Sequence, residues 1–136
     1  MRIIVNTSIL ISALLKESTT RKILLSSDIE FYLPEYSLEE IKRHIKMLCE
    51  KSGLSTDELE MLLAIISSKI SIVSASKIVE HLDEADRIIG DIDKKDIPFI
   101  ALALSIPNDG IWTNDKHFEK QSVIRVWKTD ELLNLL

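Results

Sequence analysis

The sequence predicts an α/β fold in which helices cover both faces of a parallel sheet. Two observations predict this class. Short runs of β-branched and other apolar residues recur along the chain, and the segments between them place apolar residues at the helical period. Strands that alternate with helices in this way form βα units, whose parallel strands are buried on both faces.

Length and composition limit the organisation of the protein and its location. The 136 residues predict a single domain, residues 1–136, and only three glycines and three prolines argue against a linker. Cys49, the one cysteine, has no internal disulfide partner, which fits a reducing compartment. Arg2 and the apolar run 3–15 resemble a signal peptide, but polar residues interrupt the run and no clear cleavage site follows. No stretch approaches the roughly 20 apolar residues of a membrane span, so we expect a cytoplasmic protein without a membrane partner.

The chain opens with a strand that runs into a helix. Residues 3–5 are a β-branched run, and Asn6 stands at its carboxyl end. Thr7 or Ser8 is expected to cap the helix over residues 9–16. A second helix over residues 21–27, capped by Thr19 or Thr20, and a strand over residues 29–33 follow.

A helix pair interrupts the alternation of strands and helices. Residues 37–51 carry an apolar stripe at helical spacing, and Ser55 with Glu58 forms a capping box for a helix over residues 56–69. Two helices between strands are more than a minimal crossover needs. We therefore interpret the excursion as an arm for a partner or a substrate.

The second half of the chain returns to the alternating pattern. A strand over residues 70–73 and a helix over residues 77–90 precede a helix that Asp96 opens. The closing elements, in order, are a strand at 111–113, a short helix at 116–120, a strand at 124–126 and a helix capped by Thr129.

Four polar side chains stand where strands end or helices begin: Asn6, Glu40, Asp96 and Asp115. Parallel strands bring their carboxyl ends to one rim, where ligands of open α/β sheets bind. Hard divalent cations prefer oxygen ligands, and grouped carboxylates repel one another until a cation binds among them. Such a group suits metal-assisted hydrolysis of phosphodiesters. The net charge of −5 argues against a surface that binds nucleic acid all over, but not against a local site.

Each of these residues also has a purely structural explanation. Asp96 is a favourable charge at a helix start, Asp115 a cap for the following turn, and Asn6 a hydrogen-bond partner for backbone at a strand-to-helix turn. Glu40 alone is a solvated helix residue, and the helical wheel does not separate it from Glu39. Considered by themselves, the acids near residue 90, which include Asp93, predict a charged outer face.

Four stretches in order resemble one family. They are IIVNTSILISALL, LPEYSLEEIKRHI, DIDKKDIPFIALAL and IWTNDKHF. Their order resembles PIN-domain proteins, the ribonuclease fold shared by VapC-type toxins and many archaeal single-domain proteins. The resemblance covers nearly the whole length and implies a three-layer α/β/α sandwich with a mostly parallel sheet.

The resemblance also implies roles for residues. It selects Glu40 over Glu39, and it places Asn6, Asp96 and Asp115 with Glu40 at a catalytic Mg²⁺ or Mn²⁺ site. Ser8, Asp93 and Thr113 become supporting residues. The family implies cleavage of single-stranded or structured RNA, frequent homodimers and in some members an antitoxin protein as partner.

One position departs from the family pattern, because the first motif acid is normally Asp and here is Asn6. An amide keeps the shape but loses the charge and cannot act as a base. We expect weaker metal binding and lower activity, whether the Asn is natural or engineered.

Positive charge for RNA phosphates is expected from Lys116 and Arg43, which follow Asp115 and Glu40. The other candidate ligands are all oxygen donors, which argues against His44 and His117 as metal ligands.

These motifs and residues suggest three candidate functions. The first is a metal-dependent endoribonuclease of PIN type, weakened or inactivated by Asn6. The alternative is a non-catalytic PIN-fold module that binds RNA or protein. A phosphoacceptor receiver domain is disfavoured, because no acidic pair follows the first strand.

Overall fold

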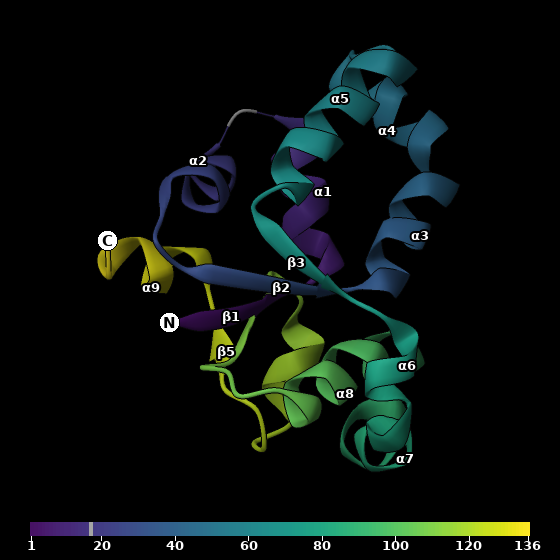
Figure 1. The fold of residues 1–136 in the computed structure, drawn as a ribbon, viewed down its shortest axis with the longest axis vertical. Coiled ribbons are helices and arrows are strands. Elements are labelled where there is room, and N and C mark those ends of the chain that lie inside the picture. Colours follow the sequence, from purple (N-terminus) through teal and green to yellow (C-terminus); the bar gives the residue numbers. More distant parts are fainter. Residues whose placement is uncertain (17) are drawn as a thin grey trace.

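The computed structural model describes residues 1–16 and 18–136, and its centre is a five-stranded parallel sheet (Figure 1). The strand order is β3-β2-β1-β4-β5. The strands are β1 (Arg2–Val5), β2 (Glu30–Pro34), β3 (Ile70–Val73), β4 (Ile111–Trp112) and β5 (Val126–Trp127). All four pairings are parallel, for example Ile4 with Ile111 and Ile3 with Phe31. The predicted α/β class with a parallel sheet is confirmed.

Helices cover both faces of the sheet (Figure 1). One face carries α1 (Thr7–Leu15), α2 (Thr19–Ser26), α3 (Glu35–Arg43), α4 (Ile45–Ser52) and α5 (Thr56–Ser67). The opposite face carries α6 (Ala75–Ile78), α7 (Leu82–Ala85) and α8 (Ile97–Ser105). The last helix, α9 (Thr129–Asn134), packs against α2. The arrangement is the expected three-layer sandwich.

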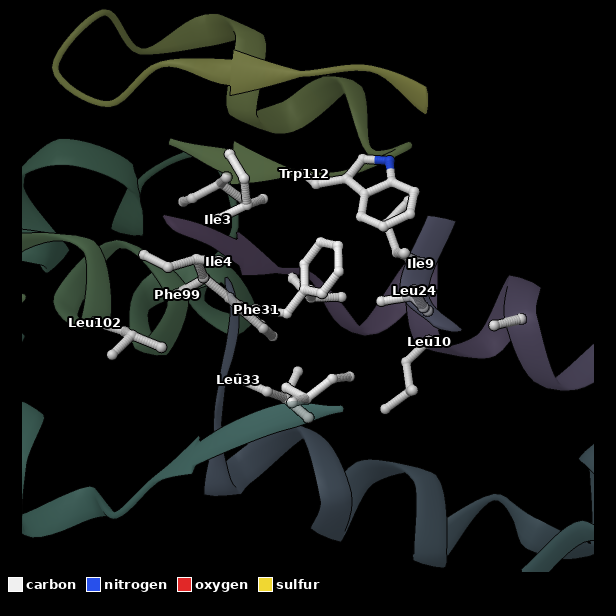
Figure 2. Close-up of a cluster of buried hydrophobic side chains, with 14 of the residues drawn as sticks. Ile3, Ile4, Ile9, Leu10, Leu24, Phe31, Leu33, Phe99, Leu102 and Trp112 are labelled. Carbon is white, nitrogen blue, oxygen red and sulfur yellow. The ribbon is translucent and has the colours of Figure 1, made fainter. Parts of the chain in front are cut away.

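The core lies on both sides of the central strand β1. Ile3, Ile4 and Val5 are fully buried although they alternate between the two faces, which explains why β1 is a continuous β-branched run. Figure 2 shows Trp112 beside Phe31, with ring centroids 5.8 Å apart. Each fully buried large side chain contributes about 1.5–3 kcal/mol of transfer free energy. Trp112 is fully buried and is therefore a core residue.

The predicted helix over residues 37–51 is two helices. It breaks at His44, whose N–H bonds to the carbonyl of Ile41 instead of continuing the α-helical pattern. Both α3 and α4 pack against α1, and Ile41 on α3 and Leu48 on α4 are both buried in the core. Tertiary packing thus overrides a continuous local periodicity.

The predicted helix over residues 77–90 is also wrong as a single element. Short helical segments replace it: α6, a 3₁₀ turn (Val79–His81), α7 and a final π turn (Asp86–Gly90). The carboxylate of Asp86 occupies the space that a Cβ at Gly90 would fill. The chain is thereby redirected just before Asp93, and single-turn π segments are frequent next to functional sites.

Several predicted caps are shifted by one residue. Asn6 caps α1 by accepting from the N–H of Ser8, and Ser18 rather than Thr19 or Thr20 caps α2. The hydroxyl of Thr129 accepts a hydrogen bond from the Trp112 indole at 3.0 Å, inside the first turn of α9. The capping box of Ser55 and Glu58 is as predicted.

The last predicted strand, 124–126, lies at Val126–Trp127 instead. Within the part of the chain that the structure describes, no helix is both long and apolar enough to cross a membrane.

Candidate metal centre

The parallel sheet brings the ends of distant segments to one rim. Asn6 directly follows β1, Glu40 lies on α3 just after β2, and Asp115 lies three residues beyond the end of β4. Asp96 ends a 3₁₀ turn, Lys94–Asp96, and stands at the N-cap position of α8. Among the described residues its side chain makes no capping hydrogen bond, so a hydrogen-bonded cap does not explain Asp96.

Three carboxylates converge on one imidazole nitrogen. The Nδ1 atom of His117 lies 3.3 Å from Oδ2 of Asp93, 3.6 Å from Oδ2 of Asp96 and 3.3 Å from Oδ1 of Asp115. We call these four residues the acidic cluster. It unites a helix start, the turn before it and the segment after β4, which only the tertiary fold brings together.

Asp96 is the buried member of the cluster. It is 4% exposed, and its Oδ2 atom has no hydrogen-bond partner in residues 1–16 and 18–136. Burial first, and then the charges of Asp93 and Asp115, raise the pKa of Asp96 from 3.8 to about 7, while His117 opposes the rise. A buried carboxylate that faces other carboxylates without donors is a site for a positive charge.

Asn6 lies beside the cluster in a small hydrogen-bond network. Its Oδ1 atom accepts from the Ser8 N–H and from the Thr113 hydroxyl, each at 3.1 Å. The Thr113 hydroxyl in turn accepts from the N–H of Asp115 at 2.9 Å, and the Ser8 hydroxyl accepts from the N–H of Asn114. The amide of Asn6 therefore fixes the start of α1 and the segment after β4 relative to each other.

Glu40 is joined to the same rim through α1. The Thr7 hydroxyl donates to its Oε1 atom at 2.9 Å and contacts the Ser37 hydroxyl at 2.8 Å. Glu40 is half-buried and Glu39 is exposed, a difference that the helical wheel did not resolve. The charge of Glu40 also contributes to the raised pKa of Asp96, but Glu40 makes no contact with His117 that the structure records.

Two members of the cluster, Asp93 and His117, make closer contacts with the other acids than the sequence predicts. Asp93, one of the acids that alone read as an outer face, is half-buried in the cluster and caps the 3₁₀ turn by accepting from the N–H of Lys95. The sequence argues against His117 as a metal ligand, yet its imidazole contacts the carboxylates of all three acids. The available signal was its position two residues after Asp115 in a predicted short helix.

The donor set fits a divalent cation. Carboxylate oxygens of Asp93 and Asp96 and a nitrogen of His117 lie within 4.8 Å of one another. The unpartnered oxygen of Asp96 needs a positive partner, and carboxylates are the ligands that Mg²⁺ and Mn²⁺ accept.

Cationic side chains flank the rim. Lys116 is exposed and lines a cavity of about 520 Å³ together with Asp115 and Lys128. On the α3 side, the guanidinium of Arg43 lies 5.8 Å from the ring centroid of Tyr36. Each flank thus offers a positive charge within a few residues of an acid.

The fold and the cluster together define an α/β protein with a candidate divalent-metal site at the carboxyl rim of a parallel sheet. The chain belongs to the PIN-domain family, since the family model for the PIN domain matches residues 4–136. It therefore has a nuclease fold. A comparison with curated proteins finds no match.

Proposed function

We propose that the protein is a metal-dependent endoribonuclease whose activity is weakened or abolished by Asn6. The observation that supports this most strongly is the acidic cluster with the unpartnered, buried oxygen of Asp96. A purely structural carboxylate would be exposed or hydrogen-bonded, because an isolated buried charge is costly. Membership of the PIN-domain family supports phosphodiester hydrolysis as the reaction.

In this proposal Asp96 and Asp115, together with Asn6 and Glu40, hold Mg²⁺ or Mn²⁺. Asp93, which the family resemblance gives only a supporting place, joins them as a possible ligand. A divalent cation supplies Lewis-acid activation of water and positive charge next to the phosphate. Thr113 and Ser8 keep Asn6 and the segment after β4 in register through the hydrogen bonds described above.

Lys116 and Arg43 bind the RNA backbone on either side of the acids, where they offset the repulsion between phosphates and carboxylates.

The direct test is cleavage of single-stranded RNA across a Mn²⁺ titration, with the unmodified protein and its Asn6→Asp variant side by side. Asn6→Asp is expected to cleave faster and at lower Mn²⁺, because a carboxylate adds the missing charge. Asp96→Asn in the Asn6→Asp background is expected to remove the gain. Equal cleavage by the unmodified protein and by Asn6→Asp would show that position 6 has no such role.

A non-catalytic module that binds RNA or protein is the second candidate, and Asn6 favours it. Both hydrogen bonds of the Asn6 oxygen serve the fold, so this oxygen has a structural role without a metal. This candidate predicts RNA binding or a stable protein complex with no turnover even in Asn6→Asp. Recovery of metal-dependent cleavage in that variant would exclude it.

A VapC-like type, with a homodimer and an antitoxin protein as partner in the cytoplasm, extends the proposal. Exposed apolar side chains on the α4–α5 arm support a protein partner: Met47, Met61 and Ile65 are 40%, 67% and 50% exposed. Exposed groups of this kind are common at protein interfaces. Sedimentation of the purified protein measures the dimer directly.

A further inference from the structure

We propose that His117 is a ligand of the bound ion and makes the site prefer first-row transition metals over Mg²⁺. This inference rests on the proposed divalent-metal site and goes beyond it, because the family resemblance supplies only oxygen donors. It is carried by the position of the imidazole inside the acidic cluster.

The Nδ1 atom of His117 faces three carboxylate oxygens at nearly equal distances of 3.3, 3.3 and 3.6 Å. None of these contacts has hydrogen-bond geometry, and within the described part of the chain the buried Nδ1 has no hydrogen-bond partner. A histidine that served only as a counter-ion would direct an N–H at one oxygen. Here the nitrogen is shared among three carboxylates instead, and it lies with oxygens of Asp93 and Asp96 in a group of possible ligand atoms within 4.8 Å of one another.

The separations also suit donors to one ion. Two ligands that each lie about 2.1 Å from an ion can be at most about 4.2 Å apart. All three distances from Nδ1 fall below this limit. The spacing therefore allows one ion to contact Nδ1 together with an oxygen of any one of the three carboxylates.

The turn that carries His117 is held firmly against α8. Phe118, the next residue, is fully buried and packs edge-on against Phe99, with centroids 6.3 Å apart. Phe99 lies three residues after Asp96, so the same aromatic contact places His117 against Asp96. The core thus fixes the backbone that carries the imidazole, while the His117 side chain itself is 42% exposed.

Ligand chemistry gives the preference. Mg²⁺ prefers oxygen ligands and seldom takes imidazole, whereas Co²⁺, Ni²⁺, Zn²⁺ and to a lesser degree Mn²⁺ bind imidazole well. A site of three carboxylates alone would not discriminate in this way. One nitrogen ligand should therefore raise affinity for transition metals selectively.

The experiment measures binding of Co²⁺ and Mg²⁺ separately at pH 8 without RNA, by calorimetry and by the visible absorption of Co²⁺. The variants are His117→Ala and, as a matched control, His44→Ala, which removes an exposed imidazole at the junction of α3 and α4. His117→Ala is expected to lose roughly tenfold or more in Co²⁺ affinity and little in Mg²⁺ affinity, since even outer partners of ligands are worth about 10–100-fold. His44→Ala should leave both affinities unchanged.

Two results would overturn the inference. Affinities for Co²⁺ and Mg²⁺ could fall by the same factor in His117→Ala, or both could rise because a competing cationic side chain is removed. If His117→Ala does not fold, paramagnetic broadening of imidazole signals by Co²⁺ in the unmodified protein decides the question, because His117 and not His44 or His81 should be affected. Binding of Co²⁺ and Mg²⁺ without discrimination leaves the proposed nuclease intact, whereas no binding of either ion removes both proposals.

Discussion

Replacement of Asp96 by Asn should stabilise the metal-free protein at neutral and alkaline pH. The buried carboxyl has a pKa of about 7 in the folded protein against 3.8 as its ordinary value. Below about pH 4 the Asp96 carboxyl is protonated in both the folded and the unfolded protein and does not change the free energy of unfolding. As pH rises from 4 to 7 the unfolded chain releases its proton first, so stability is lost, and above pH 7 the full penalty is present.

The size of the penalty follows from the two pKa values. Each tenfold change in proton affinity corresponds to about 1.4 kcal/mol, so the rise from 3.8 to about 7 corresponds to roughly 4 kcal/mol at most. Asp96→Asn removes the charge and also places an amide N–H₂ among the carboxylates of Asp93 and Asp115. The gain should therefore approach a few kcal/mol at pH 8 and vanish near pH 4.

Urea unfolding in EDTA at pH 4, 6 and 8 measures this directly. Asp91→Asn is the matched control, because Asp91 is an exposed acid of the same segment that does not contribute to the pKa of Asp96. Addition of Mn²⁺ should stabilise the unmodified protein more than Asp96→Asn, since a ligand stabilises the state that binds it. An Asp96→Asn protein that is less stable than the unmodified one at pH 8, or a difference that does not change with pH, would refute the reasoning.

Three further predictions concern the surroundings of the cluster. Thr113→Val should cost about 1–3 kcal/mol in urea unfolding, because it leaves the Asn6 oxygen and the Asp115 N–H without their shared hydroxyl; no loss would mean that water replaces it. Arg43→Ala should weaken RNA binding in EDTA and reduce the slope of log affinity against log salt concentration by about one. Lys42→Ala should change the affinity and the slope less, and equal effects of the two substitutions would place Arg43 outside the RNA path. Ile65→Glu should convert the proposed dimer to a monomer in sedimentation without changing the unfolding free energy of the monomer. A dimer that persists would move the proposed interface away from the α4–α5 arm.

The class of fold was predictable because it depends on local patterns. The β-branched run of β1 and the apolar period of α8 are visible in the sequence, and parallel strands bring their carboxyl ends together whatever the details. The proximity of Asp96 and Asp115 follows from that rule. The choice of Glu40 over Glu39 came from the family resemblance and not from periodicity.

The sequence by itself determined which elements form and which rim of the sheet gathers the acids. Tertiary structure alone decided that the chain breaks at His44, that a π turn precedes Asp93, and that the ring of His117 stands among three carboxylates. The reason is physical: strand and helix propensities act between near neighbours in the chain. The direction of a side chain at the rim depends on contacts such as Phe118 with Phe99, which join residues from separate segments.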